Sequence, residues 1–291
     1  MNEWTGVRGK QVVLTGATGG IGLAAAEALA ALGAKLAIVA RSEARASAAV
    51  ERIRAAAGGD AVVEVYRADL AAQASVRGLA AELLARLPRI DVLVNNAGAV
   101  FTGLQVTDDG VEMTWALNHL APFLLTTLLL DRLRESAPAR VITTSSGAHT
   151  RAQVPFEELE GRRPPSAGFS RYGESKLANI LFTTELARRL EGTGVTANCF
   201  HPGFVATGFG LGTGALMRVG ISLVRPFARS PRRGAETLVW LADSPDMSVE
   251  SGGYFMDRRR VTPSAAARDA DAARRLWEVS EGQTQRSAAP A

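Results

Sequence analysis

The sequence predicts an α/β protein built on a parallel β-sheet with helices on both faces. Short apolar runs alternate with longer stretches rich in Ala and Leu, which is the rhythm of strand and helix in such folds. The runs are continuously apolar instead of alternating with polar residues, as expected for strands buried on both sides. We therefore expect strands at residues 12–14, 36–39, 62–65, 92–94, 141–144 and 195–200.

Length and composition favour one domain. The chain has 291 residues and is 47% hydrophobic, which is enough to bury one large core. No internal repeat and no Gly/Ser-rich linker divides it. We expect a single domain over residues 1–291, with its core at about 8–260, a C-terminal helix at about 265–280 and a frayed tail at 281–291.

A glycine-rich turn follows the first expected strand. Residues 15–22 read Thr-Gly-Ala-Thr-Gly-Gly-Ile-Gly and lead into a helical stretch that ends near Leu32. Glycines let the backbone approach a phosphate, and the amides at the start of a helix supply donors. Although Gly19 is extra to the plain G-x-G-x-x-G spacing, the strand and helix context predicts a Rossmann-type, doubly wound fold that binds a dinucleotide. The residues expected to hold its pyrophosphate are Gly16, Thr18, Gly19, Gly20, Ile21 and Gly22.

A second motif pairs Tyr172 with Lys176. The chain has thirty Arg but only three Lys, so the choice of Lys at this position calls for an explanation. Residues four apart share one face of a helix, where the ammonium would lie beside the phenol. A nearby cation lowers a phenol pKa from its usual ~10, so that the phenol can exchange a proton with a substrate oxygen. The alternative is an incidental pair on a surface helix.

The two motifs together resemble the short-chain dehydrogenase/reductase family, and further stretches extend the resemblance over most of residues 8–260. Residues 95–98 (Asn-Asn-Ala-Gly) are similar to the segment that lines the adenosine side of the cofactor, and residues 202–207 to the loop that holds the nicotinamide. The resemblance implies a catalytic set of Asn118, Ser146, Tyr172 and Lys176, with Ser145 as the fallback for Ser146. It also implies cofactor contacts from Asn95, Ala97, Gly98, Tyr172, Lys176, Pro202, Gly203, Val205 and Thr207.

The end of the second expected strand predicts the choice of cofactor. An acidic residue there would bind the ribose hydroxyls of NAD(H) and repel a 2′-phosphate. The chain has Arg41 instead, which suits a phosphate in shape and charge, so we expect NADP(H), with Ser42 assisting. Asp69 and Leu70 resemble the family's adenine-contacting pair. For Asp69 a helix N-cap is an equally weighted alternative.

Three further stretches resemble the retinol-dehydrogenase-like branch of the family. They are the Ser-Ser-x-Ala-His run that ends at His149, residues 172–182, and His201-Pro202-Gly203. This branch takes lipophilic carbonyls and includes bacterial ketoreductases that tailor polyketides of the anthracycline type. The resemblance implies hydride transfer between the nicotinamide and a carbonyl or alcohol, with ketone or aldehyde reduction favoured. Oxidation of a retinol- or steroid-type alcohol, an enoyl reductase and a non-catalytic NADP(H)-sensing regulator are the alternatives.

Substrate choice is expected to depend on an apolar lid at about 208–230, for which a packing helix or a subunit contact is an equal alternative. The resemblance also implies a homo-oligomer, formed through helices near 111–135 and 172–191. The segment 150–170, between Ser146 and Tyr172, is an insertion that the branch shares. The bias toward Arg and Ala is typical of a high-GC bacterium.

Several function classes are disfavoured by the sequence. The three His residues show no metal-ligand spacing, and the net charge of +4 comes without a nucleic-acid motif. No G-x-S-x-G elbow surrounds Ser146, which argues against a hydrolase. The single Cys199, the polar N-terminus and the lack of an apolar stretch near ~20 residues lead us to expect a cytoplasmic protein with no membrane span.

Overall fold

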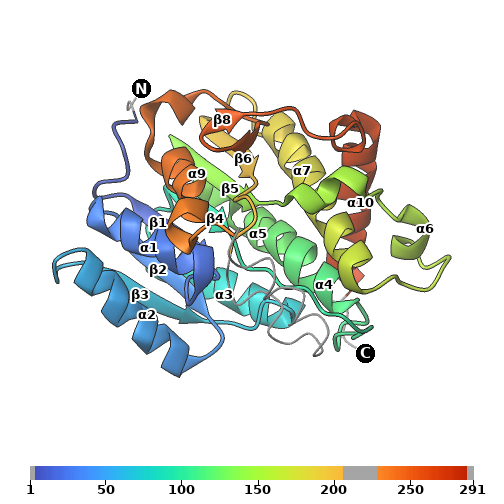
Figure 1. The fold of residues 1–291 in the computed structure, drawn as a ribbon, viewed down its shortest axis with the longest axis horizontal. Coiled ribbons are helices and arrows are strands. Elements are labelled where there is room, and N and C mark those ends of the chain that lie inside the picture. Colours follow the sequence, from blue (N-terminus) through green and yellow to red (C-terminus); the bar gives the residue numbers. More distant parts are fainter. Residues whose placement is uncertain (1–3, 206–227, 287–291) are drawn as a thin grey trace.

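The computed structural model describes residues 4–205 and 228–286 (Figure 1). These residues form one sheet in the order β3-β2-β1-β4-β5-β6-β7-β8, parallel throughout except that β8 runs antiparallel to β7. The strands are β1 (Gln11–Thr15), β2 (Lys35–Ala40), β3 (Val63–Arg67), β4 (Val92–Asn95), β5 (Ala139–Thr144), β6 (Val195–Phe200), β7 (Tyr254–Met256) and β8 (Arg259–Arg260). The six expected strands are confirmed, and β7 and β8 are short additions at the edge.

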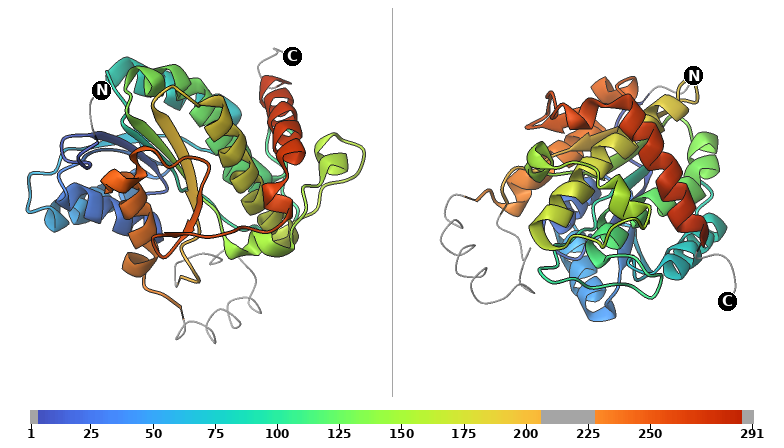
Figure 2. Two further views of the ribbon diagram at one scale, coloured as in Figure 1. Left: turned by 90° about the horizontal axis from the view of Figure 1, so that it is seen from above. Right: turned by 90° about the vertical axis from the view of Figure 1, so that its right-hand side faces the viewer.

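Helices cover both faces of the sheet, which confirms the doubly wound fold (Figures 1 and 2). One face packs against α1 (Gly20–Ala31), α2 (Glu43–Ala56) and α9 (Pro231–Asp243), and the other against α3 (Gln73–Arg86), α5 (Ala121–Glu135) and α7 (Gly168–Arg189). Among the described residues, the remaining α-helices are α4 (Met113–Trp115), α6 (Phe156–Leu159) and α10 (Ala270–Arg286), of which α10 lies against α7. The carboxyl ends of the parallel strands meet at one edge, where the predicted site residues follow them.

The helix before β5 departs from expectation. Helix α4, a π-helical segment (Ala116–Leu120) and α5 join into one helix, Met113–Glu135, whose 23 residues are long and apolar enough to cross a membrane. Pro122 does not interrupt it, because the residue directly follows the π-helical segment, where the Ala121 amide bonds the Ala116 carbonyl and the regular hydrogen-bond pattern of an α-helix is already shifted. The expectation that no stretch approaches span length was therefore wrong. In this fold, 72% of the most apolar window is buried inside the protein.

The C-terminal helix also differs from its prediction. It begins at Ala270 and continues to Arg286, so residues 281–286 of the expected tail are helical. The reason is a set of polar contacts: the Gln283 side chain accepts a hydrogen bond from Trp115 Nε1 (3.1 Å) and donates one to the Leu159 carbonyl (3.0 Å). The Thr284 carbonyl accepts from Arg77 (2.7 Å). Residues 287–291 lie outside the described part of the chain.

The insertion at 150–170 is joined to α7 by a buried ion cluster. Arg171 is 1% exposed and lies 3.7 Å from Glu112 and 3.1 Å from Glu174. Its guanidinium also bonds Glu158, which belongs to the insertion, at 2.5 Å. A buried Arg with carboxylates from three segments fixes the start of α7, and with it the neighbouring Tyr172.

Candidate active site

The glycine turn after β1 needs residues without a side chain at Gly16 and Gly22. Gly16 has a φ of +71°, and a Cβ there would lie 2.8 Å from Ala97 Cα. A Cβ on Gly22 would lie 2.1 Å from the Gly16 carbonyl oxygen, so α1 can approach the turn only with Gly at this position. Gly19 is different, because a Cβ there would meet nothing within 4 Å. Gly19 is also the N-cap of α1 and supplies no side-chain cap, so no side chain of this residue competes for the first amides of α1, where the pyrophosphate is expected.

Thr15 connects this turn to the end of the neighbouring strand β4. The sequence analysis did not predict this role. Its hydroxyl accepts hydrogen bonds from the amides of Asn96 (2.9 Å) and Ala97 (3.1 Å) and donates to the Val94 carbonyl (3.2 Å). Asn96 in turn donates from its side chain to the Thr15 carbonyl (3.2 Å). The signal that could have revealed Thr15 is a polar residue that ends an otherwise apolar strand.

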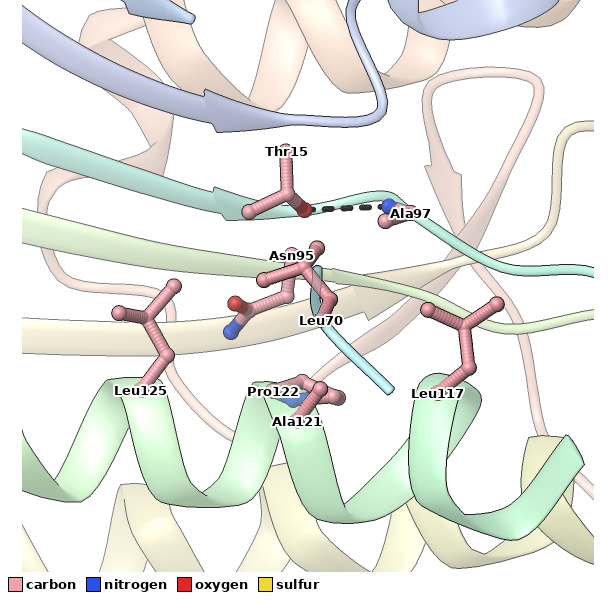
Figure 3. A pocket seen from close by; sticks show the side chains of 8 residues that line it. All are labelled: Thr15, Leu70, Asn95, Ala97, Leu117, Ala121, Pro122 and Leu125. Carbon is pink, nitrogen blue, oxygen red and sulfur yellow. Dashed lines mark hydrogen bonds between the residues drawn. The ribbon is translucent and has the colours of Figure 1, made fainter. Parts of the chain in front are cut away.

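A small cavity lies between the ends of β1 and β4 and the helix α5 (Figure 3). Three of the residues expected to contact the cofactor, Leu70, Asn95 and Ala97, are among its lining residues. Asn95 donates to the Thr126 hydroxyl (2.9 Å), but its Oδ1 is buried with no partner among the described residues. The cavity has room for about one water molecule and not for an adenosine, so the unused Asn95 acceptor suits a buried water.

Arg41 and Asp69 follow neighbouring strands and lie close together. Arg41 Nη1 is 3.8 Å from an Asp69 carboxylate oxygen, and the Arg41 side chain is 77% exposed, so its guanidinium is accessible to a ligand. Ser42 caps α2 by accepting from the Arg45 amide. The alternative that Asp69 caps a helix was wrong: α3 begins at Gln73, and the Asp69 carboxylate instead accepts from the Ala71 amide (3.0 Å), closing the turn before the helix.

Helix α7 brings Tyr172 and Lys176 to the carboxyl end of β5. Lys176 Nζ lies 5.6 Å from the centre of the Tyr172 ring and donates to the Thr144 carbonyl (3.1 Å). A Cβ on Gly98 would lie 3.3 Å from this Nζ and 3.1 Å from Asn118 Oδ1, so Gly98 leaves the room that both side chains use. The structure thus places Tyr172, Lys176, Asn118 and Gly98 together.

Asn118 lies in the π-helical segment and holds the loop after β4. Its side chain accepts from the Ala99 amide (2.9 Å) and donates to the Ala99 carbonyl (2.9 Å). It also donates to the Ser175 hydroxyl (3.1 Å), which itself donates to the Tyr172 carbonyl (2.8 Å). Ser175, which the sequence reading did not single out, therefore connects Asn118 to the turn of α7 that carries Tyr172.

Burial is the main cause of the pKa shifts of Tyr172 and Lys176. Burial raises the pKa of Tyr172 to about 12, although a hydrogen bond with the Ser146 side chain lowers this pKa. Burial also lowers the pKa of Lys176 to about 8. Desolvation of Tyr172 therefore outweighs the Ser146 hydrogen bond in the ligand-free protein, and the lowering of this pKa by the Lys176 cation stays a prediction.

The two serines after β5 differ in what their hydroxyls contact. Ser145 is buried and donates to the Lys176 carbonyl (2.7 Å), so its hydroxyl is committed to the backbone. Ser146 is the one bonded to Tyr172, and the geometry favours it over Ser145. His149 Nδ1 bonds the Ser146 carbonyl oxygen (2.7 Å) and not the Ser146 hydroxyl. The two residues are therefore not arranged as the nucleophile and base of a serine hydrolase.

The loop after β6 is described only in part. Gly203 has a φ of +81° and lies under Arg229, since a Cβ there would be 2.7 Å from Arg229 Nε. Val205 pairs with Arg229 in an isolated bridge. Thr207 and most of the expected lid, residues 206–227, lie outside the described residues. Within residues 4–205 and 228–286, no group of three or more His, Cys, Asp or Glu could hold a metal ion.

The chain is similar to known proteins in sequence and in fold. A sequence model of the family described as short chain dehydrogenase matches residues 10–213. The chain is 43% identical over 287 residues to retinol dehydrogenase 14 of Mus musculus, covering 94% of this chain and 86% of that protein. It is 42% identical over 275 residues to the proposed daunorubicin C-13 ketoreductase DnrU of Streptomyces sp. (strain C5), covering 94% and 92%. Among solved structures, a short chain dehydrogenase from Burkholderia cenocepacia in complex with NADP superposes with a TM-score of 0.69 at 28% identity, covering 90% of this chain and 99% of that one.

Proposed function

The chain belongs to the short-chain dehydrogenase family, and from this premise we propose that it is an NADP(H)-dependent carbonyl reductase of a lipophilic ketone or aldehyde. The observation that carries the proposal is the convergence of Ser146, Tyr172 and Lys176 beside an open glycine turn. Support for the cofactor comes from the exposed Arg41 and from the NADP that the Burkholderia relative binds.

The bound nicotinamide would supply the hydride, and the protein would position the carbonyl and supply the proton. In our proposal Ser146 hydrogen-bonds the carbonyl oxygen while Tyr172 donates its phenol proton to that oxygen. A phenol whose pKa is raised to about 12 carries its proton at neutral pH, but it is a weaker acid than a phenol whose pKa lies near neutrality. Lys176, bonded to the Thr144 carbonyl, would contact the nicotinamide ribose and Asn118 would keep the loop beside it in place.

Exposed apolar side chains beside Tyr172 and in two loops that follow strands support a lipophilic substrate. Phe169, one turn before Tyr172 on α7, is 52% exposed and meets the Tyr172 ring edge-on, with centroids 6.4 Å apart. Leu104 and Phe204, in the loops after β4 and β6, are more than half exposed as well. Apolar side chains exposed beside a proton donor are expected where a ligand covers them.

The two named relatives suggest two substrate classes. A retinol dehydrogenase acts on a polyene alcohol or its aldehyde, whereas a daunorubicin C-13 ketoreductase acts on a ketone of a polycyclic polyketide. We propose ketone or aldehyde reduction as the main direction and alcohol oxidation as the second candidate. A non-catalytic NADP(H) sensor is disfavoured, because such a protein has no need of the complete Asn118, Ser146, Tyr172 and Lys176 set.

The test compares purified wild type with Tyr172→Phe. Loss of NADPH absorbance is followed with aromatic polyketide ketones, retinal, steroid ketones and small aldehydes, and NADP⁺ reduction is followed with retinol. We expect wild type to reduce at least one bulky apolar carbonyl and Tyr172→Phe to lose that turnover while binding NADPH as well as wild type. Tight NADPH binding without turnover of any compound would instead favour the sensor.

Homo-oligomerisation and a cytoplasmic location remain our proposals. Part of the surface expected to join subunits is already used, because α10 packs on α7 and Trp277 contacts both Phe182 (ring centroids 5.9 Å) and Phe123 (5.0 Å). Any contact through α5 and α7 would therefore have to accommodate α10. Gel filtration with light scattering would measure the number of subunits.

A further inference from the structure

Two histidines meet at the peptide bond that follows Ser146. His149 Nδ1 lies 2.7 Å from the Ser146 carbonyl oxygen, and the Gly147 amide donates to His201 Nδ1 at 3.2 Å. The carbonyl and the amide belong to the same peptide group, so one imidazole holds each of its polar atoms. Both histidines lie in stretches that mark the retinol-dehydrogenase-like branch, and neither has a role in the proposed reaction.

We propose that His149 and His201 form a clamp that positions Ser146, and that both are positioning residues for carbonyl reduction. The clamp fixes the peptide plane after Ser146 and with it the turn whose Ala148 amide donates to the Ser146 hydroxyl (3.3 Å), the hydroxyl that bonds Tyr172. This inference rests on the proposed function for its catalytic consequence, but its geometry stands independently of the substrate.

The hydrogen-bond partners require opposite tautomers. A carbonyl oxygen only accepts, so His149 must carry its proton on Nδ1. Its Nε2 then accepts from the Ser264 amide (3.3 Å), which leaves no place for a second proton. His201 is reversed: its Nδ1 accepts from an amide and must be bare, so the proton is on Nε2. Both rings are therefore neutral.

The surroundings hold both rings in place. His149 is 2% exposed and packs edge-on against the Tyr254 ring, with centroids 5.1 Å apart. His201 is anchored by its own amide, which donates to the Phe255 carbonyl (2.9 Å). Gly147 is in close contact with His201, since a Cβ on Gly147 would lie 3.2 Å from His201 Nε2. A side chain at 147 would push the ring away from the amide that it binds.

The kinetic test uses pairs of variants that separate the two ring nitrogens. The amide group of Asn reaches the place of Nδ1, whereas that of Gln reaches the place of Nε2. With NADPH and retinal, or the first ketone that wild type reduces, we expect His201→Leu and His149→Gln to lower kcat about 10- to 100-fold. We expect His201→Asn and His149→Asn to recover most of this loss, and the Kd for NADPH to stay within about twofold in all four.

A double mutant tests whether the clamp acts through Ser146. If it does, His201→Leu should lower kcat no further in a Ser146→Ala background. Losses in kcat that multiply in the double variant would overturn the proposal. A normal kcat for His149→Gln together with a lowered kcat for His149→Asn would also overturn it, because the contact with Ser264 would then be the one that supports turnover.

Nitrogen-15 NMR of the imidazoles tests the geometry without any turnover. In the ligand-free protein we expect His149 as the Nδ1–H tautomer and His201 as the Nε2–H tautomer, with the resonances assigned from the His149→Asn and His201→Asn variants. The same tautomer on both rings would overturn the clamp even if the enzyme is active. Opposite tautomers in a protein that reduces no carbonyl would support the clamp while the proposed function failed.

Discussion

The glycine turn and the Ser146–Tyr172–Lys176 region lie at the same edge of the sheet but are held by different means. The turn depends on the absence of side chains at Gly16 and Gly22, because a Cβ at either position would block the close approach of neighbouring backbone. The second region is held by hydrogen bonds between buried polar groups, such as the bond from Lys176 Nζ to the Thr144 carbonyl and the bond from the Gly147 amide to His201 Nδ1. Substitutions should therefore act by collision in the first region and by leaving buried polar groups without partners in the second.

The largest effect is expected for Gly22→Ala. Its Cβ would overlap the Gly16 carbonyl, which is backbone and cannot turn aside, so we expect a loss of more than about 4 kcal/mol in the free energy of unfolding and no measurable NADPH binding. Urea denaturation and fluorescence titration measure the two.

Gly19→Ala is the matched control. The added Cβ would meet no protein atom within 4 Å, and the φ of −176° suits any residue. We expect unchanged stability but weaker NADPH binding, since the methyl group enters the space assigned to the pyrophosphate. Equal stability losses in the two variants would contradict a steric origin.

Next in size is Arg171→Leu, which probes the polar region. The change leaves Glu112, Glu158 and Glu174 without their shared cation, and loss of one partner of a buried ion pair typically costs about 3–5 kcal/mol. We expect unfolding free energy to fall by that amount in urea denaturation, and turnover to fall with it because Tyr172 is the next residue.

The control for Arg171 is Arg188→Leu on the same helix. Arg188 is 58% exposed, and its partner Glu185 keeps Arg189, so we expect a loss below about 1 kcal/mol. A similar loss in both variants would mean that helix propensity, and not the buried cluster, sets the result.

The two regions also differ in how far the sequence could reveal them. The six central strands and the glycine turn follow from local patterns, namely continuous apolar runs and a glycine spacing. The hydrogen bonds from Lys176 to the Thr144 carbonyl and from the Gly147 amide to His201 join residues far apart in the chain, and no local pattern encodes such a contact. The helical end of α10 was missed for the same reason, because Gln283 bonds residues more than a hundred positions away.

A third prediction concerns the stability of the fold at low pH. Burial lowers the pKa of His201 to about 4 and the charge of Arg229 adds to this effect, while Asp257 raises the pKa. Because the folded pKa lies below the unfolded value of about 6.5, the unfolded chain binds more protons, and stability falls as pH drops from 6.5 to 4.

The difference between wild type and His201→Asn isolates this contribution. Asn keeps an acceptor for Gly147 but does not titrate, so the wild type should lose up to about 3 kcal/mol relative to the variant between pH 6.5 and pH 4. Urea denaturation across this range measures it. Parallel stability curves would show that His201 is protonated as easily in the folded protein as in the unfolded chain.

The smallest effect is expected at the exposed edge of the glycine-turn region, where Arg41 contributes charge and not packing. Arg41→Asp would place a second carboxylate near Asp69, 3.8 Å from the present guanidinium, and repel a 2′-phosphate. We expect NADPH to bind about 10- to 100-fold more weakly, a change of about 1.4–2.7 kcal/mol, with NADH binding unchanged or tighter and the thermal midpoint unaltered. Arg54→Asp, at the far end of α2, changes the net charge equally and should leave both affinities as they are. If NADPH affinity fell equally in both variants, the general field of the protein and not a contact from Arg41 would select the cofactor.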